Sequence, residues 1–108
     1  MLAAILTGAV ALIFVVAGIV NIRGSESVRD GFTRAGYPEG FNIVCGGLEL
    51  VGAALMLWPV MRPFGFALLG FIMVAAIATL LRLREPFTHL APALAISALL
   101  AITAAVAA

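Results

Sequence analysis

The sequence predicts an all-α membrane protein: a bundle of four transmembrane helices with a short amphipathic interfacial helix between the first two. Of the 108 residues, 65% are hydrophobic and 10% are charged, and the mean hydropathy is +1.26. Soluble domains are about 45–50% apolar and about 25% charged. A globule this small has too little interior to bury so much apolar surface, so a soluble enzyme is excluded.

The charged residues are grouped and leave four long apolar stretches between them. Each stretch is close to the roughly 20 residues that a helix needs to cross a bilayer. Strands of a membrane barrel would instead alternate apolar and polar residues, so a barrel is excluded. We expect one domain over 1–108, with transmembrane helices over about 2–22, 41–58, 64–81 and 89–107.

The first helix is expected to pack closely against a neighbour. Ala3, Thr7 and Ala11 repeat at every fourth position, and small residues at this spacing let membrane helices approach each other. The first basic residue is Arg23, and no positive segment precedes the apolar run. We therefore expect a mature helix rather than a cleaved signal peptide.

The polar connector 23–40 is expected to form a short amphipathic helix on the membrane surface. Ser27 is predicted to cap it, with Asp30 in the capping-box position. Val28 and Phe32 lie one turn apart and begin an apolar stripe. Helix-spaced ion pairs are expected for Glu26–Arg29 and Asp30–Arg34. The candidate contacts to a partner or to the membrane surface are Val28, Phe32, Arg29, Arg34 and Tyr37. The alternative is that the connector only links two helices.

The remaining helices have recognisable ends. Trp58 lies where an interfacial aromatic residue is expected. Pro59 and Pro63 bracket a tight turn that contains Arg62. Pro92 falls in the first turn of the last helix, where proline is tolerated.

Arginine placement predicts the topology. Five of the six arginines lie in the loops after the first and third helices. The positive-inside rule then places loops 23–40 and 82–88 in the cytoplasm and both termini outside, in a bacterial-type inner membrane. No basic cluster suited to a phosphate backbone is present, so we expect no nucleic-acid partner.

Glu49 is the one charged residue inside an expected span. It lies about 12 Å along the helix from Phe41, at 1.5 Å per residue, where an acidic group costs at least about 2.5 kcal/mol. It should face the bundle interior or a cavity. The candidate polar pocket comprises Glu49, Asn21, Arg82, Thr79, His89 and Cys45. Three interpretations stay open: a Glu–Arg or Glu–Asn contact that fixes helix register, a small-molecule or quinone pocket, and proton-coupled transport.

Enzymatic and metal chemistry is not expected. His89 lacks further ligands at a suitable spacing, and the single Cys45 is typical of a small buried hydrophobic residue. The sequence contains no catalytic triad, no CxxC pair and no phosphate-binding loop. We expect no cofactor, with a quinone or a lipid as the alternative ligand.

The chain resembles the DoxX-like family of small four-helix membrane proteins. The resemblance rests on the G-Y-P turn at 36–38, the G-L-E-L-V-G stretch at 47–52, Arg62 in the next turn, Met73, and the P-A-L at 92–94. Many relatives carry a lysine where this chain has Asn21. The family includes the small subunit of an archaeal thiosulfate:quinone oxidoreductase, other components of membrane oxidoreductase complexes, and chaperones of membrane receptors. The resemblance implies the four-helix fold.

The expected function is non-enzymatic: that of an accessory subunit or assembly factor of a larger membrane complex, for example a redox or electron-transfer complex. The expected partners are the lipid bilayer and other membrane subunits or a second copy. The alternatives are a homodimeric proton-coupled transporter of small molecules and a quinone- or lipid-binding oxidoreductase component.

Overall fold

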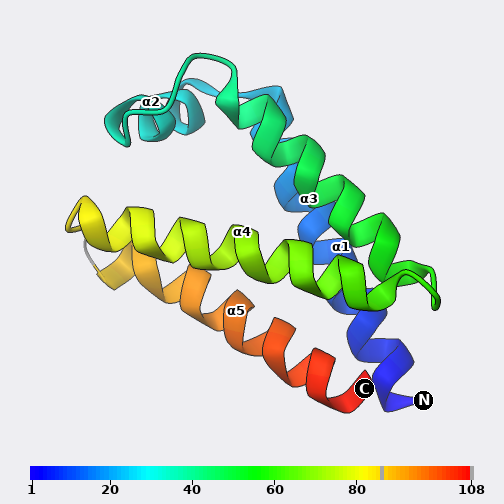
Figure 1. Cartoon of the computed structure of the whole chain (residues 1–108). Helices are drawn as coiled ribbons and strands as arrows, with labels where there is room; N and C mark the ends of the chain where they lie inside the picture. The colour runs from blue at the N-terminus through cyan, green and yellow to red at the C-terminus, as the bar shows by residue number, and fades with distance from the viewer. Residues whose placement is uncertain (86, 108) are drawn as a thin grey trace.

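The structure, a computed structural model, describes residues 1–85 and 87–107, and these form five helices. They are α1 (Leu2–Arg23), α2 (Glu26–Arg34), α3 (Phe41–Leu57), α4 (Arg62–Arg82) and α5 (Phe87–Ala107). Figure 1 shows α1 beside α3 and α4 beside α5, with α2 set apart at one end of the molecule. The predicted all-α class is confirmed.

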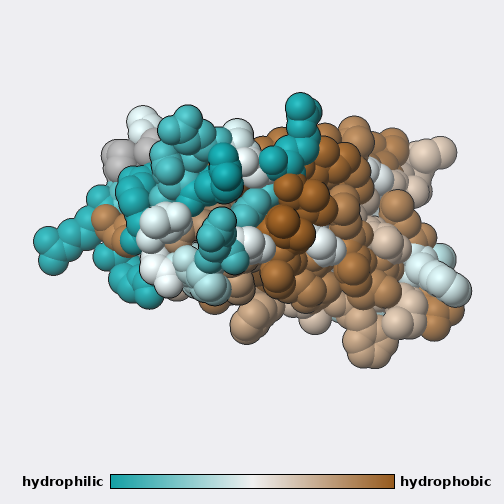
Figure 2. All heavy atoms as spheres, turned by 90° about the horizontal axis from the view of Figure 1, so that it is seen from above, coloured by the Kyte–Doolittle hydropathy of each residue, from teal (hydrophilic) through white to brown (hydrophobic). Residues whose placement is uncertain are grey.

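Two of these helices are long and apolar enough to cross a membrane: α1, with 22 residues, and α4, with 21. The 17-residue α3 and the Leu90–Val106 part of α5 are shorter apolar helices. The structure therefore supports a membrane protein, whereas four spans remain a prediction. Figure 2 shows hydrophilic residues gathered at one end of the visible face and hydrophobic residues over most of the rest.

The core is made where α1, α3, α4 and α5 meet. Its largest fully buried side chains include Phe14 of α1, Met56 of α3 and Leu69 of α4. Large side chains that point outward, such as Phe71 at 73% exposure, are also apolar. An apolar exterior of this kind suits contact with lipid and does not suit water.

Glycines bring the helix backbones into contact at two places. A Cβ on Gly46 of α3 would lie 2.5 Å from the carbonyl oxygen of Gly18 in α1. A Cβ on Gly65 of α4 would lie 2.7 Å from the backbone nitrogen of Met56 in α3. The two contacts lie at different levels of α3, so α3 packs tightly on α1 in its first half and on α4 in its second.

The cap of α2 differs from the prediction. Ser25, not Ser27, precedes the helix, and its Oγ accepts a hydrogen bond from the backbone N–H of Val28 at 3.3 Å. A capping residue must lie outside the helix in an extended conformation. Ser25 meets this condition with φ −56° and ψ 161°, whereas Ser27 is already within the first turn.

Helices α2 and α4 end in the same hydrogen-bonding motif. After α2, the N–H of Gly36 bonds to Thr33 at 3.0 Å and the N–H of Tyr37 bonds to Phe32 at 3.1 Å. After α4, the N–H of Arg84 bonds to Leu81 at 3.1 Å and that of Glu85 bonds to Leu80 at 3.0 Å. This is the Schellman motif, which needs a left-handed residue. Its left-handed residue is Gly36 (φ 85°) after α2 and Arg84 (φ 54°) after α4.

Helix α4 begins two residues before the predicted start. It starts at Arg62, with Pro63 in the first turn. Proline lacks an N–H, but the first backbone N–H groups of a helix have no partner within the helix, so proline costs little there. Helix α5 begins at Phe87, two residues before the predicted start, so Pro92 lies in its second turn and not in the first turn as predicted.

Candidate functional site

Glu49 bonds to the neighbouring helix. It lies in the middle of α3 and is 6% exposed, and its Oε1 accepts a hydrogen bond from Nδ2 of Asn21 at 2.5 Å. Asn21 is in the last turn of α1. Gly46 and Gly18 precede these two residues by three positions each and bring the helices together just beside them. The close backbone contact thus places the short Asn21 side chain within reach of the carboxyl group.

Asn42 extends this polar contact. It is 5% exposed, and its Nδ2 donates to the backbone carbonyl oxygen of Asn21 at 2.7 Å. The last carbonyls of a helix lack partners within the helix, so Asn42 satisfies one at the end of α1. The sequence reasoning missed this residue. It lies seven residues before Glu49, and this spacing places the two side chains on the same face of the helix, which could have indicated a shared polar site. We call Asn21, Asn42 and Glu49 the polar junction.

Arg82 and Thr79 do not belong to the polar junction, which corrects the predicted pocket. Nη2 of Arg82 donates to the carbonyl oxygen of Ala35 at 2.7 Å. Oγ1 of Thr79 lies 2.8 Å from the hydroxyl of Tyr37. Both side chains are engaged by the segment that ends α2, because its carbonyl and hydroxyl groups offer them partners.

The two remaining residues of the predicted pocket are Cys45 and His89. Cys45 is a half-buried free thiol one turn before Glu49. The side chain of His89 lies outside the described residues. Among the residues that the structure does describe, no group of three or more His, Cys, Asp or Glu side chains could hold a metal ion.

The aromatic side chains of the connector pack against the start of α3. Phe32 and Tyr37 form a cluster with Phe41, in which the Tyr37 and Phe41 rings stack with centroids 4.6 Å apart. Of the predicted contact residues, Val28 is half-buried and Arg29 is exposed. Phe32 and Tyr37 therefore anchor α2 to the start of α3, in addition to any role at the membrane surface.

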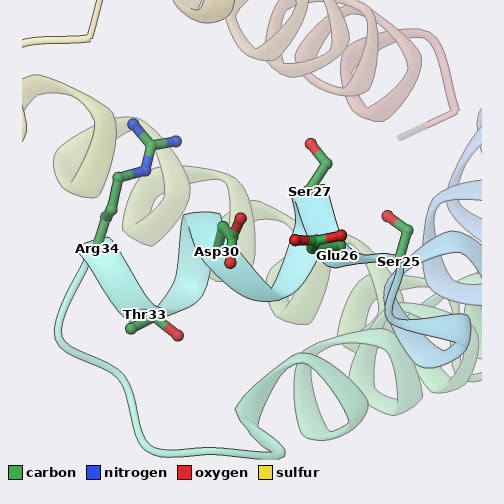
Figure 3. Close-up of a pocket in the computed structure, with 6 residues that line it drawn as sticks. All are labelled: Ser25, Glu26, Ser27, Asp30, Thr33 and Arg34. Carbon is green, nitrogen blue, oxygen red and sulfur yellow. The ribbon is translucent and has the colours of Figure 1, made fainter.

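Arg34 forms a long-range pair instead of the predicted one with Asp30. Its Nη1 lies 2.9 Å from Oε1 of Glu85. Figure 3 shows the Arg34 side chain extending away from α2, with Asp30 and Glu26 further along the same helix. Neither the Glu26–Arg29 nor the Asp30–Arg34 ion pair is found among the described residues. Exposed helix pairs contribute only about 0.2–0.5 kcal/mol each, so the competing contact to Glu85 is enough to replace the second of them.

The surface of the described residues has hollows away from the polar junction, and two of them are lined as follows. One is open and lies on the polar side of α2, with a volume of about 820 Å³. The residues that line it are Ser25, Glu26, Ser27, Asp30, Thr33 and Arg34 (Figure 3). The other, of about 260 Å³, lies between α4 and α5 and is lined mainly by apolar residues such as Phe66, Met73 and Leu100. Neither hollow includes a residue of the polar junction.

Helices α1, α3, α4 and α5 are apolar, a buried carboxyl–amide contact joins two of them, and most of the charged residues lie at one end. These features define a small helical membrane protein. The chain belongs to the DoxX-like family, whose model matches residues 5–105. The family resemblance identified from the sequence is thereby confirmed. No curated protein and no solved structure matches the chain.

Proposed function

We propose that this protein is a non-catalytic accessory subunit or assembly factor of a larger membrane complex, such as a redox complex. The observation that supports the proposal is the Asn21–Glu49 hydrogen bond. It uses the one acidic side chain of the apolar helices to join α1 to α3. The polar junction thus serves the packing of the bundle, and the large apolar exterior is left for lipid and for partner helices.

The proposal includes four membrane spans in a bacterial-type inner membrane. Helix α3 packs along α1, and α5 packs on both α4 and α1, so the four apolar helices lie side by side. Loops 23–40 and 82–88 would be cytoplasmic and the termini outside, as the arginine distribution indicates. The charged connector would then lie at the level of the lipid headgroups.

The direct test is the native mass of tagged protein extracted from its own membranes in mild detergent, with mass spectrometry of what elutes with it. We expect a reproducible assembly with a stoichiometric partner. Elution as a small self-assembly, with no partner protein, would overturn the accessory role.

Proton-coupled transport by a homodimer is the second candidate, since Glu49 is an acidic group buried in an apolar helix. Its test is pH-driven uptake of substrate into liposomes by the native protein and by Glu49→Gln. Uptake that survives the substitution would exclude Glu49 as the proton carrier.

A quinone- or lipid-binding oxidoreductase component is the third candidate, and the apolar hollow between α4 and α5 gives it a place to bind such a ligand. Organic extraction of gently solubilised protein, followed by chromatography, tests it. An extract without quinone or stoichiometric lipid would count against this function.

A further inference from the structure

The C-terminal ends of α2 and α4 are joined by two arginine side chains, one from each helix. Arg34, the last residue of α2, donates from Nη1 to Oε1 of Glu85 at 2.9 Å, and Glu85 closes the motif that ends α4. Arg82, the last residue of α4, donates from Nη2 to the carbonyl oxygen of Ala35 at 2.7 Å, and Ala35 caps α2. Each helix therefore sends its final side chain to the residues that follow the other helix.

This exchange has an electrostatic reason. The C-terminal end of a helix carries a partial negative charge and carbonyl groups without partners. Two such ends would repel each other if they met without cations between them. A third contact, between the Tyr37 hydroxyl and Oγ1 of Thr79 at 2.8 Å, joins the same two ends. We call the three contacts, Arg34–Glu85, Arg82–Ala35 and Tyr37–Thr79, the clasp.

Side chains rather than packed backbones hold α2 to α4. Helix α2 has no buried residue. It packs on α3, and among the described residues no comparable packing joins it to α4 or α5. The backbone has positive φ at Gly24 (61°) before α2, and at Gly36 and Gly40 (both 85°) after it. Glycine adopts such angles without a steric penalty and can leave them as easily, so the backbone on either side of α2 can adjust when the helix pairs change their angle.

The clasp closes the end of the molecule at which the two helix pairs diverge. Helices α3 and α4 touch at Gly52 and Gly65, near the turn that joins them. From there the α1–α3 pair and the α4–α5 pair separate toward the end that carries α2 (Figure 1). The connector is attached by its chain to the first pair and by the clasp to the second.

We infer that the clasp is a releasable latch that sets the angle between the two helix pairs. When it is closed, α2 bridges them. When it breaks, α2 leaves α4 together with α3, to which the cluster of Phe32, Tyr37 and Phe41 holds it, and the pairs change their relative angle while each helix stays intact. The Arg34 side chain is 61% exposed and the Glu85 side chain is 10% exposed, so water and salt reach the ion pair from the arginine side and screen it there. The inference does not depend on the proposed accessory role, because it concerns the isolated protein.

The test is a distance measurement by double electron–electron resonance on the full chain in lipid nanodiscs. Spin labels are attached at Ser27→Cys in α2 and Ala78→Cys in α4, in a Cys45→Ala background. With the clasp intact we expect a single narrow distance peak.

Glu85→Arg places a cation against Arg34 and should replace that peak by a broad distribution at longer distances. The double variant Arg34→Glu/Glu85→Arg should restore the narrow peak. Glu39→Arg makes the same charge change on the connector outside the clasp and should leave the peak unaltered.

Two results would overturn the latch. One is a narrow peak that survives in Glu85→Arg. The other is a charge-swapped variant that keeps its helical content but does not regain the narrow peak. If Glu85→Arg does not fold, the latch can still be tested in the labelled protein with its clasp residues intact, by changing the salt concentration. Raising the salt concentration from about 0.1 M to about 1 M shortens the Debye length from about 10 Å to about 3 Å. The latch then predicts a larger fraction of long distances, and a distribution unaltered by salt overturns it.

Discussion

Gly18 and Gly46 meet backbone to backbone across the α1–α3 interface. A Cβ on Gly46 would lie 2.5 Å from the Gly18 carbonyl oxygen, and a Cβ on Gly18 would lie 2.8 Å from the Gly46 carbonyl oxygen. Because the obstructing atoms belong to the backbone of the opposite helix, they cannot turn aside as a side chain can. This reciprocal contact sets the helix separation at which Asn21 reaches Glu49.

Replacing Gly46 by alanine should therefore force α1 and α3 apart. We expect Gly46→Ala to lower the free energy of unfolding by about 1–3 kcal/mol, the usual cost of overpacking. The measurement is unfolding in mixed detergent micelles, followed by circular dichroism. Gly47→Ala is the matched control, since a Cβ at Gly47 meets nothing within 4 Å. The control should be neutral or gain up to about 1 kcal/mol from helix propensity. Equal effects at the two positions would show that the contact does not limit the packing.

The buried carboxyl–amide contact gives a second prediction. Asn21→Ala leaves the Glu49 carboxyl group without its donor and should cost about 1–3 kcal/mol of unfolding free energy. In a double-mutant cycle of Asn21→Ala and Glu49→Ala, the coupling should lie near 0.6 kcal/mol and at most about 1.7 kcal/mol, the range measured for hydrogen bonds between membrane helices. Thr33→Ala on the exposed side of α2 serves as the control. A coupling of zero would mean that the two side chains stabilise the bundle independently.

The distribution of charged residues along the chain predicts much of the fold. Only Glu49 interrupts the apolar stretches, so their positions locate the helices, and Gly36 with Tyr37 and Pro38 marks the end of α2. The cap at Ser25 was missed because two serines flank Glu26, and only the backbone angles decide which one lies outside the helix.

The candidate site was less predictable. Glu49 stood out because an acidic residue in an apolar helix needs a partner, and Asn21 was among the residues named for that purpose. Arg82 and Thr79 were also assigned to it, because they are expected at the same end of the bundle. Sequence spacing gives the level of a side chain along the bundle but not the direction in which it points. The partners of Arg82 and Thr79, Ala35 and Tyr37, lie 47 and 42 residues away in the chain.

Arg84 offers a stabilising substitution. It is the left-handed residue of the motif after α4, at the position that Gly36 occupies after α2. The left-handed conformation costs a residue with a Cβ roughly 1–2 kcal/mol. We expect Arg84→Gly to raise the free energy of unfolding by about 1 kcal/mol in the same assay. Arg84→Gln removes the same charge but keeps the Cβ, and it should give no gain. A gain of equal size in both variants would assign the effect to charge.

Labelling at one position before α3 and one after it tests the membrane topology. Residues 27 and 60 flank α3, and Val60 is 76% exposed. In a Cys45→Ala background, we expect a membrane-impermeant maleimide to label Ser27→Cys only in inverted vesicles and Val60→Cys only in intact cells. Labelling of both positions from the same side would show that α3 does not cross the bilayer and would contradict the four-span arrangement.

The shortness of α3 has a consequence for the surrounding lipid. Its 17 residues span only about 25 Å at 1.5 Å per residue, whereas the hydrocarbon core of a typical bilayer is about 30 Å thick. The 22-residue α1 is long enough to cross and to tilt. In the four-span arrangement we expect the bilayer to thin beside α3 and to keep its thickness elsewhere, so that the lipid annulus around the protein is uneven. Lipids with shorter acyl chains should gather on the α3 side, and the acyl-chain length of the host membrane becomes a variable that tunes the stability of the bundle.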